Sequence, residues 1–131
     1  MKYKKLFLIF FMLLFANAED RCKSQEMQEA VKQIKAIFNP PTRIDPISTL
    51  IEVDCNNDTL EYKYTLDPVN DIKSPSTQQS MKKRIDERNQ ALYCENEFMS
   101  WYKYNDFGMS WSYYLDNKLI IFIKKTAKDC S

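Results

Sequence analysis

The chain has 131 residues, with 19 lysines and arginines against 18 aspartates and glutamates, and it contains no histidine. This length suits one domain with a single core. A formal net charge of +1 gives no electrostatic case for a nucleic acid or an anionic membrane as partner. Because histidine is the commonest general base and metal ligand, its absence removes most small hydrolases that use a serine or cysteine nucleophile.

Residues 1–18 have the pattern of a secretory signal peptide. Three lysines precede an apolar run over residues 6–15, which is followed by an Ala-Asn-Ala triplet at residues 16–18 that suits a signal peptidase. We therefore expect an exported protein, periplasmic or secreted, with one α+β domain over residues 19–131. Removing the three lysines leaves 16 basic residues against 18 acidic ones, a net charge of −2. No later stretch is long and apolar enough for a transmembrane helix.

The first half of the domain predicts a helix followed by two strands. Ser24 is placed to cap the helix, and Asn39-Pro40-Pro41 ends it. Its apolar positions follow the i, i+3, i+4, i+7 rule and are Met27, Ala30, Val31, Ile34, Ile37 and Phe38. Residues 50–55 and 60–66 alternate apolar with polar side chains. The expected inward positions are Ile51, Val53 and Cys55 on the first strand and Leu60, Tyr62, Tyr64 and Leu66 on the second.

The second half repeats this order. A helix capped by Ser76 or Thr77 runs towards Cys94, with a thin apolar stripe of Met81, Ile85, Leu92 and Tyr93. The only glycine, Gly108, suggests a positive φ or a bulge before a strand with Met109, Trp111, Tyr113 and Leu115 inward. After an Asp-Asn turn, the last strand over residues 118–125 carries apolar side chains on both faces, so we expect it to be buried on both sides.

Two α-β-β halves predict a two-layer α+β domain, in which a four-stranded antiparallel sheet carries two helices on one face. Cys22, Cys55, Cys94 and Cys130 form an even set, as expected for disulfides in an exported chain. Of the three pairings, we favour Cys22–Cys55 and Cys94–Cys130, because each bridge closes one half. Without histidine or a CxxC pair we expect no metal site, and no motif implies a cofactor.

Aromatic residues gather between Tyr93 and Tyr114, where they serve either as core or as a contact surface. Alternation places Trp111 and Tyr113 inward. The candidates for an exposed binding surface are Trp101, Tyr102, Tyr104 and Tyr114. Such rings stack on sugars or form protein-binding hot spots, and the sequence does not choose between these uses.

Acidic residues near the second helix offer a different hypothesis. A glycan hydrolase needs only two carboxyl groups about 5–9.5 Å apart, and the available acids are Asp86, Glu87, Glu95 and Glu97. Solvated charges on a helix face are the ordinary explanation of such a group. The triplet Asn57-Asp58-Thr59 matches an N-glycosylation sequon on a predicted turn, which has a meaning only in a cell that glycosylates such sites.

We interpret the chain as a small exported, non-enzymatic binding protein that contacts another protein of the envelope or extracellular space, as an accessory, inhibitor or immunity protein does. The alternatives are the carboxylate-dependent hydrolase and a secreted effector or toxin. If no helix covers the second face of the sheet, Ile120 and Phe122 form an apolar strip that needs a partner or a second subunit, and a homodimer is then expected.

Overall fold

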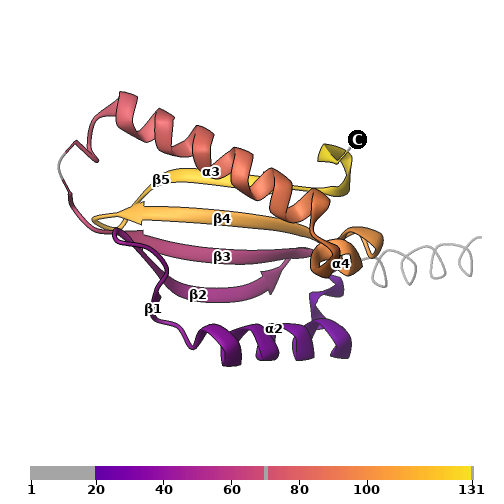
Figure 1. Cartoon of the computed structure of the whole chain (residues 1–131). Coiled ribbons are helices and arrows are strands. Elements are labelled where there is room, and N and C mark those ends of the chain that lie inside the picture. The colour runs from indigo at the N-terminus through magenta and orange to yellow at the C-terminus, as the bar shows by residue number, and fades with distance from the viewer. Residues whose placement is uncertain (1–19, 70, 131) are drawn as a thin grey trace, which may run out of the picture.

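The computed structural model describes residues 20–69 and 71–130, so the predicted signal peptide, residues 1–18, lies outside the described residues. The described chain forms an α+β domain with three α-helices, short 3₁₀ turns and one five-stranded sheet (Figure 1). The helices are α2 (Gln25–Phe38), α3 (Pro75–Glu95) and α4 (Ser100–Tyr104). The strands are β1 (Thr42–Arg43), β2 (Ser48–Asn56), β3 (Thr59–Leu66), β4 (Gly108–Leu115) and β5 (Lys118–Lys125). The 3₁₀ turns are η1 (Arg21–Lys23), η2 (Glu97–Met99) and η3 (Ala127–Asp129).

The α+β class is confirmed, but the predicted sheet of four antiparallel strands is wrong. The sheet has the order β1-β2-β3-β4-β5, and β3 and β4 run parallel, with Thr59 beside Gly108. The reason lies in α3, whose 21 residues span about 32 Å and carry the chain back along the sheet. The next strand therefore starts at the end where β3 starts, which makes a parallel neighbour. The short β1, paired with Thr49 and Leu50, is the additional strand.

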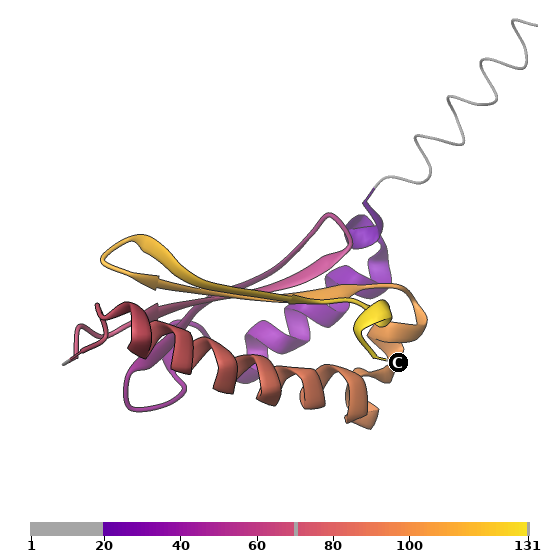
Figure 2. The same ribbon diagram turned by 90° about the horizontal axis from the view of Figure 1, so that it is seen from above.

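Both long helices lie on one face of the sheet, which we call the inner face (Figure 2). Helix α2 packs on β2 and α3 packs on β5. The core between them and the sheet contains Met27 and Val31 of α2, Met81, Ile85 and Tyr93 of α3, and inward side chains of β2 to β5. The apolar pattern of α2 is correct except at its end, because Ile37 and Phe38 are exposed.

Local signals explain where the elements begin and bend. The Ser24 hydroxyl accepts a hydrogen bond from the Met27 amide, as its predicted cap role requires, whereas α3 starts after Ser74 with Pro75 in its first turn, not after Ser76 or Thr77. In β2 the register shifts between Leu50 and Glu52. This irregularity leaves Ile51 exposed, so its predicted inward position is wrong.

Gly108 has a negative φ, so the predicted positive φ is wrong. A Cβ atom at this position would lie 3.0 Å from the Lys125 carbonyl oxygen. Glycine is therefore needed here for the close approach of β4 and β5. The two hairpin turns instead place positive φ on Asn57 and Asp58 and on Asp116 and Asn117, as type I′ turns require.

Two disulfides join Cys22 to Cys55 and Cys94 to Cys130, the pairing that we favoured. The first bridge ties η1 to the end of β2, and the second ties the end of α3 to the segment that follows β5. Over residues 20–69 and 71–130, no helix is long and apolar enough to cross a membrane.

Asn89 is a polar residue in the buried stripe of α3. Its side chain is 2% exposed, and its Nδ2 atom has no hydrogen-bond partner within the described part of the chain. We expect Asn89→Leu to raise the free energy of unfolding by about 1 kcal/mol, because it removes an unpaired buried donor and improves helix propensity. Urea unfolding measures the change, with Gln79→Leu on the exposed side of the same helix as control. A loss of stability specific to Asn89→Leu would contradict the prediction.

Candidate functional site

The centre of the inner face is lined by aromatic side chains of β3 and β4. Because α2 packs on β2 and α3 on β5, the two helices lie at opposite sides of this face (Figure 1). The rings of Tyr64 and Tyr113 stack with centroids 4.6 Å apart, and those of Tyr62 and Trp111 stack at 6.3 Å. Tyr62 and Tyr64 are only half-buried, whereas Trp111 and Tyr113 are buried. We use the name tyrosine trough for the set of inner-face tyrosines between α2 and α3, which are Tyr62, Tyr64, Tyr102 and Tyr113; Tyr113 and Tyr102 each also line a cavity.

The hydroxyl groups of the trough share one electrostatic environment. Burial raises the pKa of Tyr62, and the neighbouring Tyr102 raises it further. Burial likewise raises the pKa of Tyr64 and Tyr113, while the guanidinium of Arg88 opposes the shift at both residues. All these phenols stay protonated at neutral pH and can donate hydrogen bonds. The trough is therefore an aromatic surface with polar tips, the kind of surface that protein interfaces favour.

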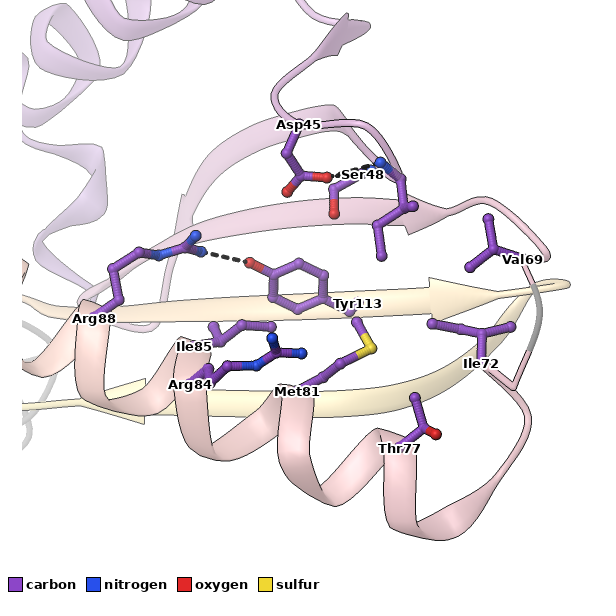
Figure 3. Close-up of a pocket in the computed structure, with 11 residues that line it drawn as sticks. Asp45, Ser48, Val69, Ile72, Thr77, Met81, Arg84, Ile85, Arg88 and Tyr113 are labelled. Carbon is purple, nitrogen blue, oxygen red and sulfur yellow. Dashed lines mark hydrogen bonds between the residues drawn. The ribbon is translucent and has the colours of Figure 1, made fainter.

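At one end of the trough lies a cavity of about 460 Å³, which we call the α3 pocket (Figure 3). It lies between α3, the start of β2 and the loops next to them. Apolar side chains make up most of its wall, with charged groups at the rim. The lining residues are Asp45, Ile47, Ser48, Val69, Ile72, Thr77, Met81, Arg84, Ile85, Arg88 and Tyr113.

The charged groups of the α3 pocket are two arginines and one aspartate. Arg88 Nη2 lies 3.5 Å from the Tyr113 hydroxyl oxygen, whereas Arg84 makes no side-chain hydrogen bond within the described ranges. Neither arginine has an ion pair there. The Asp45 carboxylate is occupied locally, because one oxygen accepts hydrogen bonds from the Ile47 and Ser48 amides at 2.9 and 2.7 Å (Figure 3). Both guanidinium groups are therefore available to an incoming carboxylate.

The other end of the trough is acidic and aromatic. A cavity of about 450 Å³ there has Glu26 and Glu29 of α2 on one side, and Phe98 with Trp101 and Tyr102 on the other. The inner face therefore has glutamates at the cavity that Tyr102 lines, beside α4, and arginines at the cavity that Tyr113 lines, beside α3. A bound segment with a basic group at one end and an acidic group at the other would bind in one orientation, with its acidic end at the arginines.

The structure separates the four aromatic residues that the sequence suggested as a binding surface. Trp101 and Tyr102 lie at the acidic end of the trough with their rings edge to face, and Tyr104 on the same helix is 86% exposed. Tyr114 lies near the far end of β4, about 20 Å along the strand from Gly108. There Lys63 Nζ sits 5.7 Å from its ring centroid. The four residues do not form one patch, and a binding role for them stays a prediction.

The four carboxylates of the hydrolase hypothesis are spread along α3 and η2. Asp86 forms an ion pair with Lys125, and Glu87 points to solvent from the same helix. Glu95 lies nine residues beyond Asp86 on α3, a helical rise of about 13 Å, and Glu97 follows in η2. This rise exceeds the separation that either glycosidase mechanism uses, which argues against Asp86 and Glu95 as a catalytic pair. None of the four lines the tyrosine trough.

Sequence reasoning missed the residues that define the trough. Tyr62 and Tyr64 were placed on the inward face by alternation and were treated as core. Arg84 and Arg88 belong to no motif, and Arg88 falls between Ile85 and Leu92, where the apolar stripe of the helix is interrupted. No signal in the sequence shows that α2 packs on β2 and α3 on β5, at opposite edges of the inner face, and this placement leaves both tyrosines half-buried.

No family model matches this sequence, and no curated protein does either. Three solved structures have a similar fold. A Pseudomonas aeruginosa protein described as secreted aligns at TM-score 0.58 and 12% identity, covering 82% of this chain and 98% of its own. The type II secretion pilotin EpsS of Vibrio vulnificus aligns at 0.56 and 14% identity, covering 79% and 90%. The Vibrio cholerae type II secretion pilotin AspS aligns at 0.53 and 12% identity, covering 78% and 86%, and at these identities the likeness establishes the fold alone.

Proposed function

We propose that this protein is a non-enzymatic accessory protein of the cell envelope, which binds a segment of a partner protein in the tyrosine trough. The observation that carries the proposal is the row of half-open tyrosines that ends at two arginines without an acidic partner. Tyrosine and arginine are the residues most enriched in protein-binding hot spots. The fold is shared with two secretion pilotins and a secreted protein, and export agrees with the two disulfides and the predicted signal peptide.

The side chains of the trough indicate what kind of peptide segment would bind there. Its floor offers ring faces and its α3 pocket offers apolar contacts with Val69, Ile72 and Met81. A ligand therefore needs apolar side chains along one side. An aspartate, a glutamate or a terminal carboxylate close to Arg84 and Arg88 would complete the charged rim. The carboxylate-hydrolase alternative is not favoured by any pair of acids, and nothing in the described structure favours an effector or toxin over the accessory role.

Site-specific crosslinking in the producing cell tests this proposal. A photoreactive amino acid is placed at Val69, which is exposed and lines the α3 pocket, and separately at Lys83, which is exposed on α3 away from it. We expect one envelope protein to be captured from position 69 and not from position 83. Mass spectrometry identifies the captured protein and the crosslinked segment.

A charge reversal at the rim provides the matched control. Arg84→Glu should reduce the yield of the position 69 crosslink by about tenfold, because a like charge would face the acidic group of the segment. Lys83→Glu makes a charge change of the same sign and size on the same helix and should leave the yield unchanged. Equal crosslink yields from positions 69 and 83 would contradict binding in the trough. A yield from position 69 that Arg84→Glu does not change would contradict it as well.

A further inference from the structure

The sheet face turned away from α2 and α3, which we call the outer face, carries three exposed apolar side chains. Ile51, Leu119 and Phe122 are 38%, 45% and 47% exposed. No helix packs there, as the view along the sheet shows (Figure 2). Burial of β5 on both sides is therefore wrong. The predicted strip of Ile120 and Phe122 is wrong in part, because Ile120 packs against the core and Leu119 is the residue exposed with Phe122. Ile51 lies on β2, whereas Leu119 and Phe122 lie on β5, so the apolar side chains occupy opposite sides of this face with β3 and β4 between them.

Charges on the outer face are divided between its two sides. The strand register places Asp54, Glu61, Ser110 and Lys124 in one row across β2, β3, β4 and β5. The row therefore starts with two acidic residues and ends with a basic one. None of the three charged residues forms an ion pair within the described residues. A shallow depression of about 310 Å³ surrounds the acidic pair, next to Glu52 and Lys63.

The acidic side of one outer face can therefore pair with the basic side of the outer face of a second copy. A two-fold axis parallel to the strands, placed between β3 and β4, lays β5 of one copy over β2 of the other and keeps each row in place. Lys124 of one copy then faces Asp54 and Glu61 of the other. In the same arrangement Phe122 and Leu119 lie over Ile51, which occupies the irregularity of β2 between their two rows. The row of Phe122 also contains Lys63 and Glu52, which already pair with each other at 3.6 Å within one copy.

We propose that two copies of this chain associate through their outer faces, with Lys124 of each copy paired with Asp54 of the other. The four long strands form a face of roughly 20 by 26 Å, so both copies together bury roughly 1,000 Å². That area is at the low end for specific interfaces, and the dimer is accordingly weak and reversible. The inference goes beyond the proposed function, because the trough lies on the inner face and stays open in the dimer.

Sedimentation equilibrium of the purified, oxidised protein over a range of concentrations tests the dimer. We expect a monomer–dimer equilibrium that weakens as salt screens the ion pairs. Lys124→Glu and Asp54→Lys should each weaken association by about tenfold or more, because each change acts twice in a two-fold dimer. The double variant restores the pair with its charges exchanged and should return to within about threefold of the unaltered protein.

Two matched controls separate the interface from general effects. Lys83→Glu makes the same charge change as Lys124→Glu on the opposite face and should have no effect on association. Phe122→Ser should weaken the dimer, whereas Phe98→Ser, at a side chain that is 87% exposed in η2, should not. A protein that stays monomeric up to about 1 mM would overturn the proposal. An association constant that Lys124→Glu leaves unchanged would overturn it as well. So would a double variant whose association constant stays as low as those of the single variants.

Discussion

Trp111→Ala is expected to lower the free energy of unfolding by about 3–5 kcal/mol, the range observed when large buried aromatic residues are truncated. Trp111 is 3% exposed and lies at the centre of β4. Its ring stacks on Tyr62, and its register partner on β5 is Ile123. The alanine variant would leave a cavity under the floor of the trough, so we also expect weaker binding of the proposed segment.

The other tryptophan of the chain provides the control. Trp101 is 38% exposed on α4 and stacks against Phe107. Trp101→Ala should cost about 1 kcal/mol, since it loses a surface aromatic contact without opening the core. Urea unfolding of both variants, followed by far-UV circular dichroism, measures the difference. Equal losses for the two variants would show that Trp111 is not the buried centre of the sheet.

Loss of the Cys94–Cys130 bridge is the second large effect that we expect. The bridge closes a loop with a sequence separation of 36 residues, and the chain-entropy account assigns about 3–4 kcal/mol to such a loop. It also holds η3 against α3, where Gln90 donates a hydrogen bond to the Asp129 carbonyl oxygen at 2.6 Å. Cys94→Ser should therefore destabilise the domain and release the C-terminal turn.

The pairing of Cys94 with Cys130 makes three variants equivalent. Cys94→Ser, Cys130→Ser and the double variant each remove the same bond, so their free energies of unfolding should agree within about 0.5 kcal/mol. A double variant that is much less stable than either single one would contradict the pairing. A peptide map of the non-reduced protein should show Cys22 with Cys55 in all three variants.

Much of the local structure could be predicted from periodicity. The apolar spacing of Met27 to Ile34 marks the buried side of α2, and alternation from Leu60 to Leu66 identifies the inward side of β3. These patterns depend on neighbours within a few residues, which the sequence displays directly. Two exceptions have causes outside this local pattern: β2 shifts its register on β3 around Ile51, and a side chain at Gly108 would meet a backbone oxygen of β5. The cause in each case is a partner strand.

The candidate site was less predictable than the elements that form it. Alternation shows that Tyr64 and Tyr113 point to the same face, but not whether a helix covers them. Arg84 and Arg88 could equally have been ordinary surface charges of α3. Their position at the rim of a cavity depends on where α3 crosses the sheet. Trp101 and Tyr114 illustrate the reverse error, because proximity in sequence suggested one surface and the fold places them far apart.

By itself, the sequence determined the two long helices, the four long strands and the α+β class, since these follow from short-range patterns, and it favoured the cysteine pairing that the structure has. Only the tertiary structure decided the parallel pairing of β3 with β4, because it depends on the direction in which α3 returns across the sheet. It also decided which aromatic side chains stay open between α2 and α3, and which charges share a row on the outer face. Those features depend on contacts between residues far apart in the chain, which local periodicity does not encode.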